Sequence, residues 1–480
     1  MPAFIVGVGM VGTASWLRIV AAMGGPSLVR GILGQARPIL VGQVAGIAFA
    51  VTDTVLAGRA SPMDLATMGL GLSVYSTVFV GLMGATSALN PIVAQHFGGE
   101  RHATIGATYV QGLWMALFLS AIGMIPLLLA NVWLPWLHAP SDVEAHVTRY
   151  LRVLALALPG ALMFRAIYAV NTAVSRPHVV MTLQLAGLLL KVCLSYLLIF
   201  GGLGLPRMGA VGGAVASLVV FWAVFLLGFW YMRRSSFYRR FAIHRAWPRW
   251  SVQREILGLG IPMSISYALE ATSFTAITLL AARLGTTVMG GHQVVANLAA
   301  LCFMLPLSLS VATATLTAQA IGADDPRRAR ATALTGMRIA ALVAAVTALL
   351  VWTLRGGIVR LYSRDPAVVA TALTLIPFLA AFHFFDALQV VASFVLRAYK
   401  LAIAPTVIHA TALWGLGVVG GYLVAFGGLW GPPWGIAGMW LMQSLALALA
   451  ALLLVGFYLG LPQTILPTVR GSRRFLGRNA

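Results

Sequence analysis

The chain has 480 residues, of which 60% are hydrophobic and 9% are charged, and its formal net charge is +21. A soluble globular protein carries roughly 25% charged residues, so this composition excludes a soluble domain and indicates an integral membrane protein. Most of the basic residues are arginines in short loops, a pattern typical of cytoplasmic loops rather than of nucleic-acid binding.

Twelve apolar stretches follow one another along the chain, and each is long enough to cross a bilayer as a helix of about 20 residues. No basic residue precedes Arg18, which argues against a signal peptide, so residues 1–29 are predicted to be an N-terminal extension. The predicted spans are 30–58, 65–92, 103–135, 146–170, 178–200, 209–232, 255–283, 288–318, 328–354, 367–396, 402–426 and 435–460.

The two halves of the sequence repeat with a constant offset. Ile-Leu-Gly at 32–34 recurs at 256–258, and Pro38 recurs as Pro262 at the same offset. An even number of spans in each repeat predicts parallel halves, related by a pseudo-two-fold axis along the membrane normal. We therefore predict an all-α integral membrane protein with twelve transmembrane helices in two six-helix lobes.

The predicted domains follow from these spans and from the distribution of charge. Seven arginines lie between residues 233 and 254, and alternate loops are also basic, so both termini are expected in the cytoplasm, with anionic lipids next to the basic loops. The predicted limits are 30–232 for the N-lobe, 233–254 for a basic cytoplasmic linker, 255–460 for the C-lobe and 461–480 for a basic tail.

Eight of the eleven acidic residues lie in loops or at span ends, and three lie inside spans: Asp53, Glu270 and Asp386. Glu270 falls near the middle of the apolar stretch 256–282, where a carboxylate costs several kcal/mol unless it is paired, protonated or in contact with water. Either basic residues such as Lys191 neutralise these acids and fix helix packing, or the acids bind a cation along a transport path. We favour the second interpretation.

Sequence motifs limit the energy source. The only two lysines, Lys191 and Lys400, do not follow glycine, so no phosphate-binding loop is present, and no HExxH or GxSxG motif occurs. We expect neither an enzyme nor an organic cofactor. The remaining source is an ion gradient, worth about 2.3 kcal/mol per charge per 100 mV.

The chain resembles the NorM branch of the multidrug and toxic compound extrusion (MATE) family over all twelve spans. The residues that carry the resemblance are Gln43 with Asp53 and Gly58, the set Pro91, Ala94-Gln95 and Gly98, then Glu270, His292-Gln293-Val294, and Asp386-Ala387-Leu388-Gln389. The resemblance implies a monomeric antiporter of the bacterial inner membrane, which exports hydrophobic, often cationic, drugs by alternating access.

The resemblance also implies roles for particular residues. Glu270 and Asp386 would bind the coupling cation, Na⁺ or H⁺, and the nearby ring of Phe382 could face a cation. Asp53 would bind a proton or contact substrate. Four further residues would line the substrate cavity, unless they serve only helix packing: Ser73, Phe274, Gln293 and Phe303.

Span 5 departs from the family pattern. The branch commonly places two asparagines one turn apart, where this chain has Lys191 and Ser195. Lys191 is expected either to pair with Asp53 or to extend toward the membrane interface. An alternative function is a flippase for lipid-linked intermediates, but such a cavity should contain several bases, and only Lys191 and Arg165 qualify.

Overall fold

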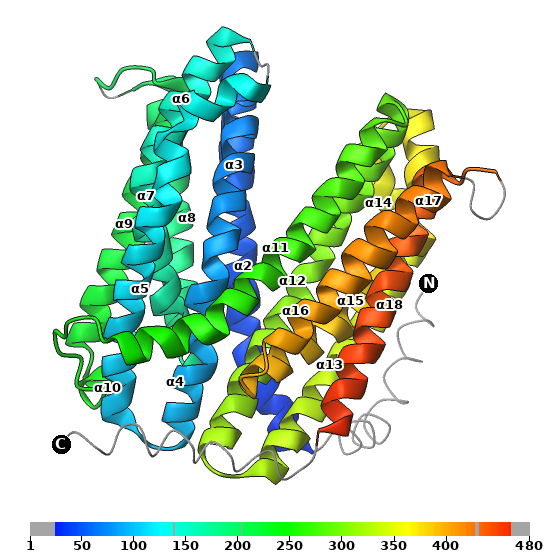
Figure 1. Cartoon of the computed structure of the whole chain (residues 1–480). Helices are drawn as coiled ribbons and strands as arrows, with labels where there is room; N and C mark the ends of the chain where they lie inside the picture. Colours follow the sequence, from blue (N-terminus) through cyan, green and yellow to red (C-terminus); the bar gives the residue numbers. More distant parts are fainter. Residues whose placement is uncertain (1–24, 138–139, 203, 428–431, 462–480) are drawn as a thin grey trace, which may run out of the picture. The chain divides into compact units, whose positions relative to one another are not determined.

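The computed structural model describes residues 25–137, 140–202, 204–427 and 432–461. Within these residues, twelve helices are long and apolar enough to cross a membrane, which confirms the predicted number of spans. Figure 1 shows the helices in chain order. Most of the predicted N-terminal extension and all but the first residue of the predicted basic tail lie outside the described residues.

Among the described residues, six of the twelve spans lie in each half of the sequence. The first half contains α2 (Pro26–Ala60), α3 (Pro62–Ser87), α4 (Leu89–Gly98), α5 (His102–Leu128), α6 (Ala130–Trp133), η1 (Leu134–Leu137), α7 (Ser141–Ala173), α8 (Pro177–Phe200), α9 (Gly209–Arg234) and α10 (Ser236–Arg239). The second half contains α11 (Trp250–Ala282), α12 (Thr286–Gly322), α13 (Pro326–Thr353), α14 (Arg355–Tyr362), α15 (Pro366–Ala398), α16 (Ile403–His409), η2 (Ala410–Gly420), α17 (Gly421–Phe426) and α18 (Gly435–Gly460).

The helix boundaries repeat with the offset found in the sequence. The span formed by α3 and α4 runs from 62 to 98 and α12 from 286 to 322, so both ends are displaced by the offset that separates Pro38 from Pro262. The starts of α2 and α11, at 26 and 250, differ by the same offset. The internal duplication therefore extends to the positions at which helices begin and end.

Short polar side chains start several of these helices. The Ser61 hydroxyl accepts a hydrogen bond from the Asp64 backbone N–H at 3.0 Å and caps α3. Asp365 caps α15 by accepting from the backbone N–H of Ala367 at 2.8 Å, and Asp325 caps α13 in the same way. The first turn of a helix has N–H groups without intrahelical partners. Ser61, Asp325 and Asp365 therefore supply the hydrogen-bond acceptors that these N–H groups need.

The predicted third span, 103–135, is too long at its C-terminal end. Helix α5 ends at Leu128, two residues after Pro126, and the chain continues in the short helices α6 and η1. The Trp133 indole N–H donates to the Pro126 carbonyl at 2.8 Å, which links α6 to the last turn of α5. Apolar composition alone does not reveal this break.

The chain packs into two compact units. Of the described residues, those of 38–271 form the N-unit, and those of 25–37 and 272–461 form the C-unit. The boundaries fall inside α2 and α11, so the first turns of α2 belong to the C-unit and the first part of α11 belongs to the N-unit. The predicted lobe limits, 30–232 and 255–460, stay a prediction.

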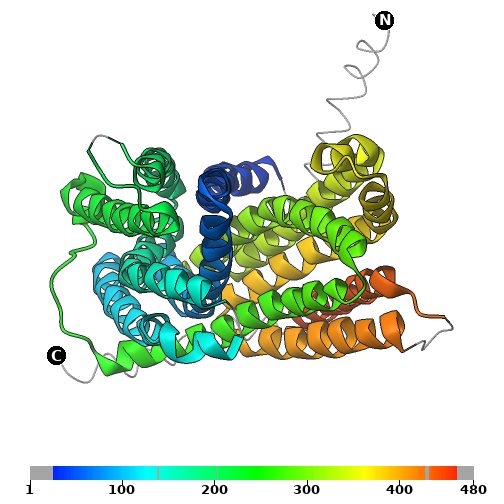
Figure 2. The same ribbon diagram turned by 90° about the horizontal axis from the view of Figure 1, so that it is seen from above.

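One long helix forms the centre of each unit. In the N-unit, α7 packs against α3, α5 and α9, and in the C-unit α15 packs against α12, α13 and α18. The helices can be followed from above in Figure 2. The spans that contain α7 and α15 begin at 142 and 366, again at the offset of the repeat. The same element of the repeat is therefore central in both units.

Asp64 ties together the ends of α2, α3 and α9. Its carboxylate accepts from the Ala210 backbone N–H at 2.6 Å and from the Ser61 hydroxyl at 2.7 Å. The Arg207 guanidinium adds a second link by donating to the Ala60 carbonyl at 2.8 Å. These bonds fix the end of α2 against the start of α9.

Asp64→Ala should lower the free energy of unfolding by about 1–3 kcal/mol, because it leaves the Ala210 N–H without its acceptor and removes the side-chain partner of Ser61. Thermal unfolding of the purified protein in detergent measures the change. Asp324→Asn is the matched control, since Asp324 is exposed and has a positive φ of 60°, which asparagine tolerates. Equal melting temperatures for the two variants would contradict the role of Asp64.

Candidate functional site

The N-unit contains a buried ion pair between α2 and α8. The Lys191 Nζ lies 2.8 Å from the Asp53 Oδ1, and the two side chains are 1% and 5% exposed. Lys191 therefore does not extend toward the membrane interface, and the expected pairing with Asp53 is present. A buried charge that loses its partner destabilises a protein strongly, so each of these residues depends on the other.

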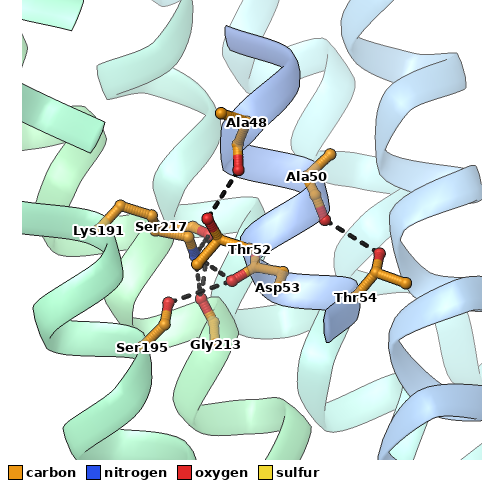
Figure 3. A network of polar contacts seen from close by, with 9 residues as sticks. All are labelled: Ala48, Ala50, Thr52, Asp53, Thr54, Lys191, Ser195, Gly213 and Ser217. Carbon is orange, nitrogen blue, oxygen red and sulfur yellow. Dashed lines mark hydrogen bonds and ion pairs between the residues drawn. The ribbon is translucent and has the colours of Figure 1, made fainter. Parts of the chain in front are cut away.

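Two residues of α9 complete the surroundings of the ammonium group. Lys191 Nζ also donates to the Gly213 carbonyl at 2.9 Å and to the Ser217 hydroxyl at 2.6 Å. Asp53 accepts a further bond from the Ser195 hydroxyl at 3.1 Å. Figure 3 shows these groups converging from α2, α8 and α9. Three helices thus hold one cation among oxygen atoms.

Local sequence explains why these helices approach closely. A Cβ atom at Gly212 would lie 2.4 Å from the Leu198 carbonyl oxygen, so only glycine allows α9 to lie this close to α8. On α2, the hydroxyls of Thr52 and Thr54 bond to carbonyls of their own helix at 2.7 and 3.0 Å. Asp53, between them, is the side chain of this turn that extends to the neighbouring helices (Figure 3).

The C-unit has a different polar network around Asp386. The Gln389 amide nitrogen donates to the Asp386 Oδ1 at 3.0 Å, and the Gln389 oxygen lies 2.9 Å from the His409 Nε2. Because the amide oxygen can only accept, His409 is the donor. All three side chains are buried. Within the described part of the chain, no base lies within ion-pair distance of Asp386, whose hydrogen-bond donor is the neutral amide of Gln389.

A second chain of hydrogen bonds fixes the protonation of His292. The Trp440 indole N–H donates to the His292 Nδ1 at 3.2 Å, so this nitrogen accepts. The His292 Nε2 therefore carries the proton and faces the Thr278 hydroxyl at 3.0 Å, which donates to the Phe274 carbonyl. A neutral imidazole satisfies every bond in this chain.

Phe274 and Phe382, two of the predicted site residues, pack together in the core of the C-unit. Their ring centroids are 6.4 Å apart, and both contact Trp440, at 6.2 and 5.4 Å. Edge-to-face packing of this kind adds to the energy of apolar burial. Phe382 is 9% exposed, so its ring serves packing in this conformation. A cation-binding role for it stays a prediction.

The other predicted residues have varied surroundings. Glu270 is partly buried on α11 and belongs to the N-unit, whereas Asp386 belongs to the C-unit. Ser73 is exposed and donates to the Gly69 carbonyl of its own helix. Gln293 is exposed and donates to Asn297, and Phe303 is partly buried on α12.

Gly213, Ser217, His409 and Trp440 were missed as site residues by sequence reasoning, which searched the spans mainly for charged groups. A usable signal was nevertheless present. Gly213 and Ser217 lie one turn apart in an apolar helix, and His409 is a polar residue at the start of the π-helical turns of η2. Among the described residues, no group of three or more His, Cys, Asp or Glu side chains could hold a metal ion.

The basic linker is attached to the N-unit through α5. The Gln111 amide donates to the Trp247 carbonyl at 2.9 Å and accepts from the Arg249 backbone N–H at 2.8 Å. The Trp114 indole donates to the Ala246 carbonyl and stacks on the Trp247 ring at 6.2 Å. The linker therefore has a defined conformation along this helix.

A cavity of about 450 Å³ lies within the linker, and its lining includes Arg233, Arg239, His244 and Arg245. None of its eight described lining residues is acidic. Tyr238, also in the lining, donates to the Asn171 side chain at 2.5 Å. Burial raises the pKa of the Tyr238 hydroxyl, so this group remains a protonated donor.

These features define a class of protein. Large apolar side chains remain exposed along the helices of both units, for example Leu189 at 71% and Leu452 at 70%, as expected of surfaces in contact with lipid. Ionisable groups lie deep between the helices, where they are functional in most membrane proteins. The chain is a multi-pass membrane protein with a polar network inside each unit.

Comparison with known proteins identifies the family. The MatE family model matches residues 38–197 and 262–423, two segments that begin at equivalent positions of the repeat. The chain is 39% identical over 424 residues to a probable multidrug resistance protein NorM of Aromatoleum aromaticum, covering 87% of this chain and 91% of that protein. It is 33% identical to the multidrug resistance protein MdtK of Yersinia pseudotuberculosis, covering 89% and 94%. The chain therefore belongs to the MatE family, as its resemblance predicted.

Solved structures agree at the level of the fold. The crystal structure of the eukaryotic MATE transporter AtDTX14 matches with a TM-score of 0.85 at 20% identity, covering 93% of this chain and 99% of that one. An outward-facing MATE transporter matches with a TM-score of 0.81 at 16% identity, covering 94% of this chain and 98% of that one.

Trp440→Phe should lower the free energy of unfolding by about 1 kcal/mol or more, because it keeps most of the ring packing but removes the N–H donor to the buried His292. The measurement is thermal unfolding in detergent. Trp434→Phe serves as the control, since Trp434 is 47% exposed. A Trp440→Phe variant as stable as the control would show that the hydrogen bond has no net effect.

Proposed function

We propose that this protein exports hydrophobic, often cationic, drugs and toxic organic compounds in exchange for Na⁺ or H⁺. The observation that carries the proposal is the similarity along most of the chain to proteins named multidrug resistance proteins NorM and MdtK. We further propose that the protein works as a monomer in the bacterial inner membrane with both termini in the cytoplasm. The arginine-rich linker supports this orientation.

In the C-unit, Asp386 is the strongest candidate for binding the coupling ion. It is 7% exposed, and its described partner is the neutral amide of Gln389. A buried carboxylate without a basic partner is stabilised when it binds a proton or a cation. Glu270, near the middle of α11, is the corresponding candidate in the N-unit.

Transport then follows from competition between the ion and the substrate. An organic cation enters from the cytoplasm or the inner leaflet and is attracted by the carboxylates of Glu270 and Asp386. Ions that arrive from outside neutralise these groups and favour release of the substrate. Coupling requires that each species bind the inward-open and outward-open states with different affinities.

Four residues are proposed to contact the substrate during this cycle. Ser73 and Gln293 carry exposed polar side chains, and Phe274 and Phe303 are partly buried aromatic residues. Aromatic rings and a few polar groups suit a cavity that accepts varied apolar cations.

The flippase alternative requires free positive charge in the cavity. Lys191 instead donates to three oxygen atoms of its own chain. The Arg165 guanidinium lies over the Tyr168 ring at 4.5 Å. The bases that would hold an anionic headgroup are thus engaged, which supports export of cations.

Glu270→Gln and Asp386→Asn should each reduce gradient-driven efflux to below about a tenth of the wild-type rate. Each variant loses the carboxylate charge, and a loss of about 1.4 kcal/mol in the free energy of ion binding lowers the affinity for the ion tenfold. The assay follows a fluorescent organic cation in proteoliposomes under an imposed Na⁺ or pH gradient. Asp142→Asn is the control, because Asp142 is exposed in the first turn of α7.

Normal coupled efflux by either variant would refute the role of that acid. Gradient-driven movement of a lipid-linked anion, without movement of the cation, would replace the proposed function by the flippase alternative.

The cavity of the basic linker is proposed to contact anionic lipid at the cytoplasmic surface. Arg239→Gln together with Arg245→Gln should remove about 2 kcal/mol of the stabilisation by anionic lipid, at about 1 kcal/mol per arginine. Melting temperatures in nanodiscs of phosphatidylglycerol and of phosphatidylcholine measure the effect, and Arg364→Gln in another loop is the control. An unchanged preference for phosphatidylglycerol would contradict the proposal, and stabilisation by free phosphate alone would point to a soluble ligand.

A further inference from the structure

The surroundings of Lys191 have the composition of a cation site. Its Nζ is held by a carboxylate oxygen of Asp53, a backbone carbonyl of Gly213 and the hydroxyl of Ser217, at 2.8, 2.9 and 2.6 Å. Carboxylate, carbonyl and hydroxyl oxygens are also the groups that replace the water around a bound hard cation. We propose that the Lys191 ammonium occupies a monovalent-cation site, so that the chain supplies the cation of this site itself.

The number of bonds supports this assignment. An ammonium group has three N–H donors and no acceptor, and each donor of Lys191 has one oxygen partner. The Ser217 hydroxyl donates to the Gly213 carbonyl at 3.0 Å, so its lone pairs face the lysine. The ammonium is therefore fully coordinated without water.

The origin of the oxygen atoms also distinguishes this site from a simple surface ion pair. They come from α2 and α9, whereas the ammonium comes from α8. The fourth oxygen, of Ser195, lies one helical turn after Lys191 and donates to the Asp53 Oδ1 at 3.1 Å. Ser195 thus orients the Asp53 carboxylate, and the three oxygen atoms around the ammonium lie among buried side chains, those of Asp53, Lys191 and Ser217.

The first consequence concerns sodium. A free sodium ion has no place next to Asp53 while Lys191 is present. Shortening Lys191 leaves a vacant anionic site of oxygen atoms that Na⁺ can fill. The second consequence rests on the proposed function. Exchangeable coupling ions bind at Glu270 and Asp386 and not at Asp53.

Sodium binding to the purified full-length protein tests the inference. Binding of ²²Na⁺ is measured in detergent, with choline as the replacement cation, for wild type, Lys191→Ala and the double variant Lys191→Ala/Asp53→Asn. We expect Lys191→Ala to bind one more sodium ion per chain than wild type, and the double variant to bind the same number as wild type. Methylammonium, which carries the lost ammonium group, should displace only the additional ion.

Two results would overturn the inference: a folded Lys191→Ala protein with the same sodium count as wild type, or a wild-type count that exceeds that of the double variant. If Lys191→Ala unfolds in choline, recovery of its melting transition in Na⁺ or methylammonium supports the inference, and no recovery in either ion overturns it. Wild-type protein that fails to export the fluorescent cation would overturn the proposed function but leave these counts unchanged.

Discussion

Lipid offers no hydrogen bonds, so every polar group inside the membrane must find its partner within the protein. In the part of the chain that the structure describes, the backbone meets this requirement by forming twelve helices long enough to cross a membrane. The Lys191 ammonium meets it with three oxygen atoms from two neighbouring helices. That arrangement in turn requires the close approach of α8 and α9 at Gly212, and Asp64 holds the ends of α2 and α9 in place. The packing of α2, α8 and α9 in the N-unit thus provides the hydrogen-bond partners of one buried charge.

The two units share a scaffold but not its chemistry. Helix boundaries repeat at a constant offset, yet the positions equivalent to Asp53 and Asp386 are Ile277 and Leu162, both buried and apolar. In the N-unit Lys191 neutralises Asp53, whereas in the C-unit Asp386 accepts a hydrogen bond from Gln389, which in turn accepts one from His409. A paired acid is stable as it stands, but an acid without a basic partner favours an incoming cation. In the proposed transport cycle, Asp53 therefore keeps the cation of Lys191, whereas Asp386 can exchange its cation.

The C-unit combines its acid with a rigid aromatic core. Phe382 lies one turn before Asp386 on α15 and packs on Trp440, which also holds His292 in its neutral form. Rings and hydrogen bonds thus fix the position of α15, the central helix of the unit. In the cycle proposed for this protein, a change of charge at Asp386 acts on a helix whose neighbours are already fixed.

The sequence by itself determined the class of protein, the number of spans, the repeat and the family, because these depend on composition, hydrophobic length and offset. It also selected Asp53, Lys191 and Asp386, since an ionisable residue in an apolar span is conspicuous. It did not reveal Gly213, Ser217, His409 or Trp440, whose residue types are common in helices and whose meaning lies in contacts with distant residues. It predicted the end of the third span wrongly because the bond between Trp133 and Pro126 leaves no trace in hydropathy. Only the tertiary structure decided which oxygen atoms surround Lys191, because side chains far apart in the sequence become neighbours through helix packing alone.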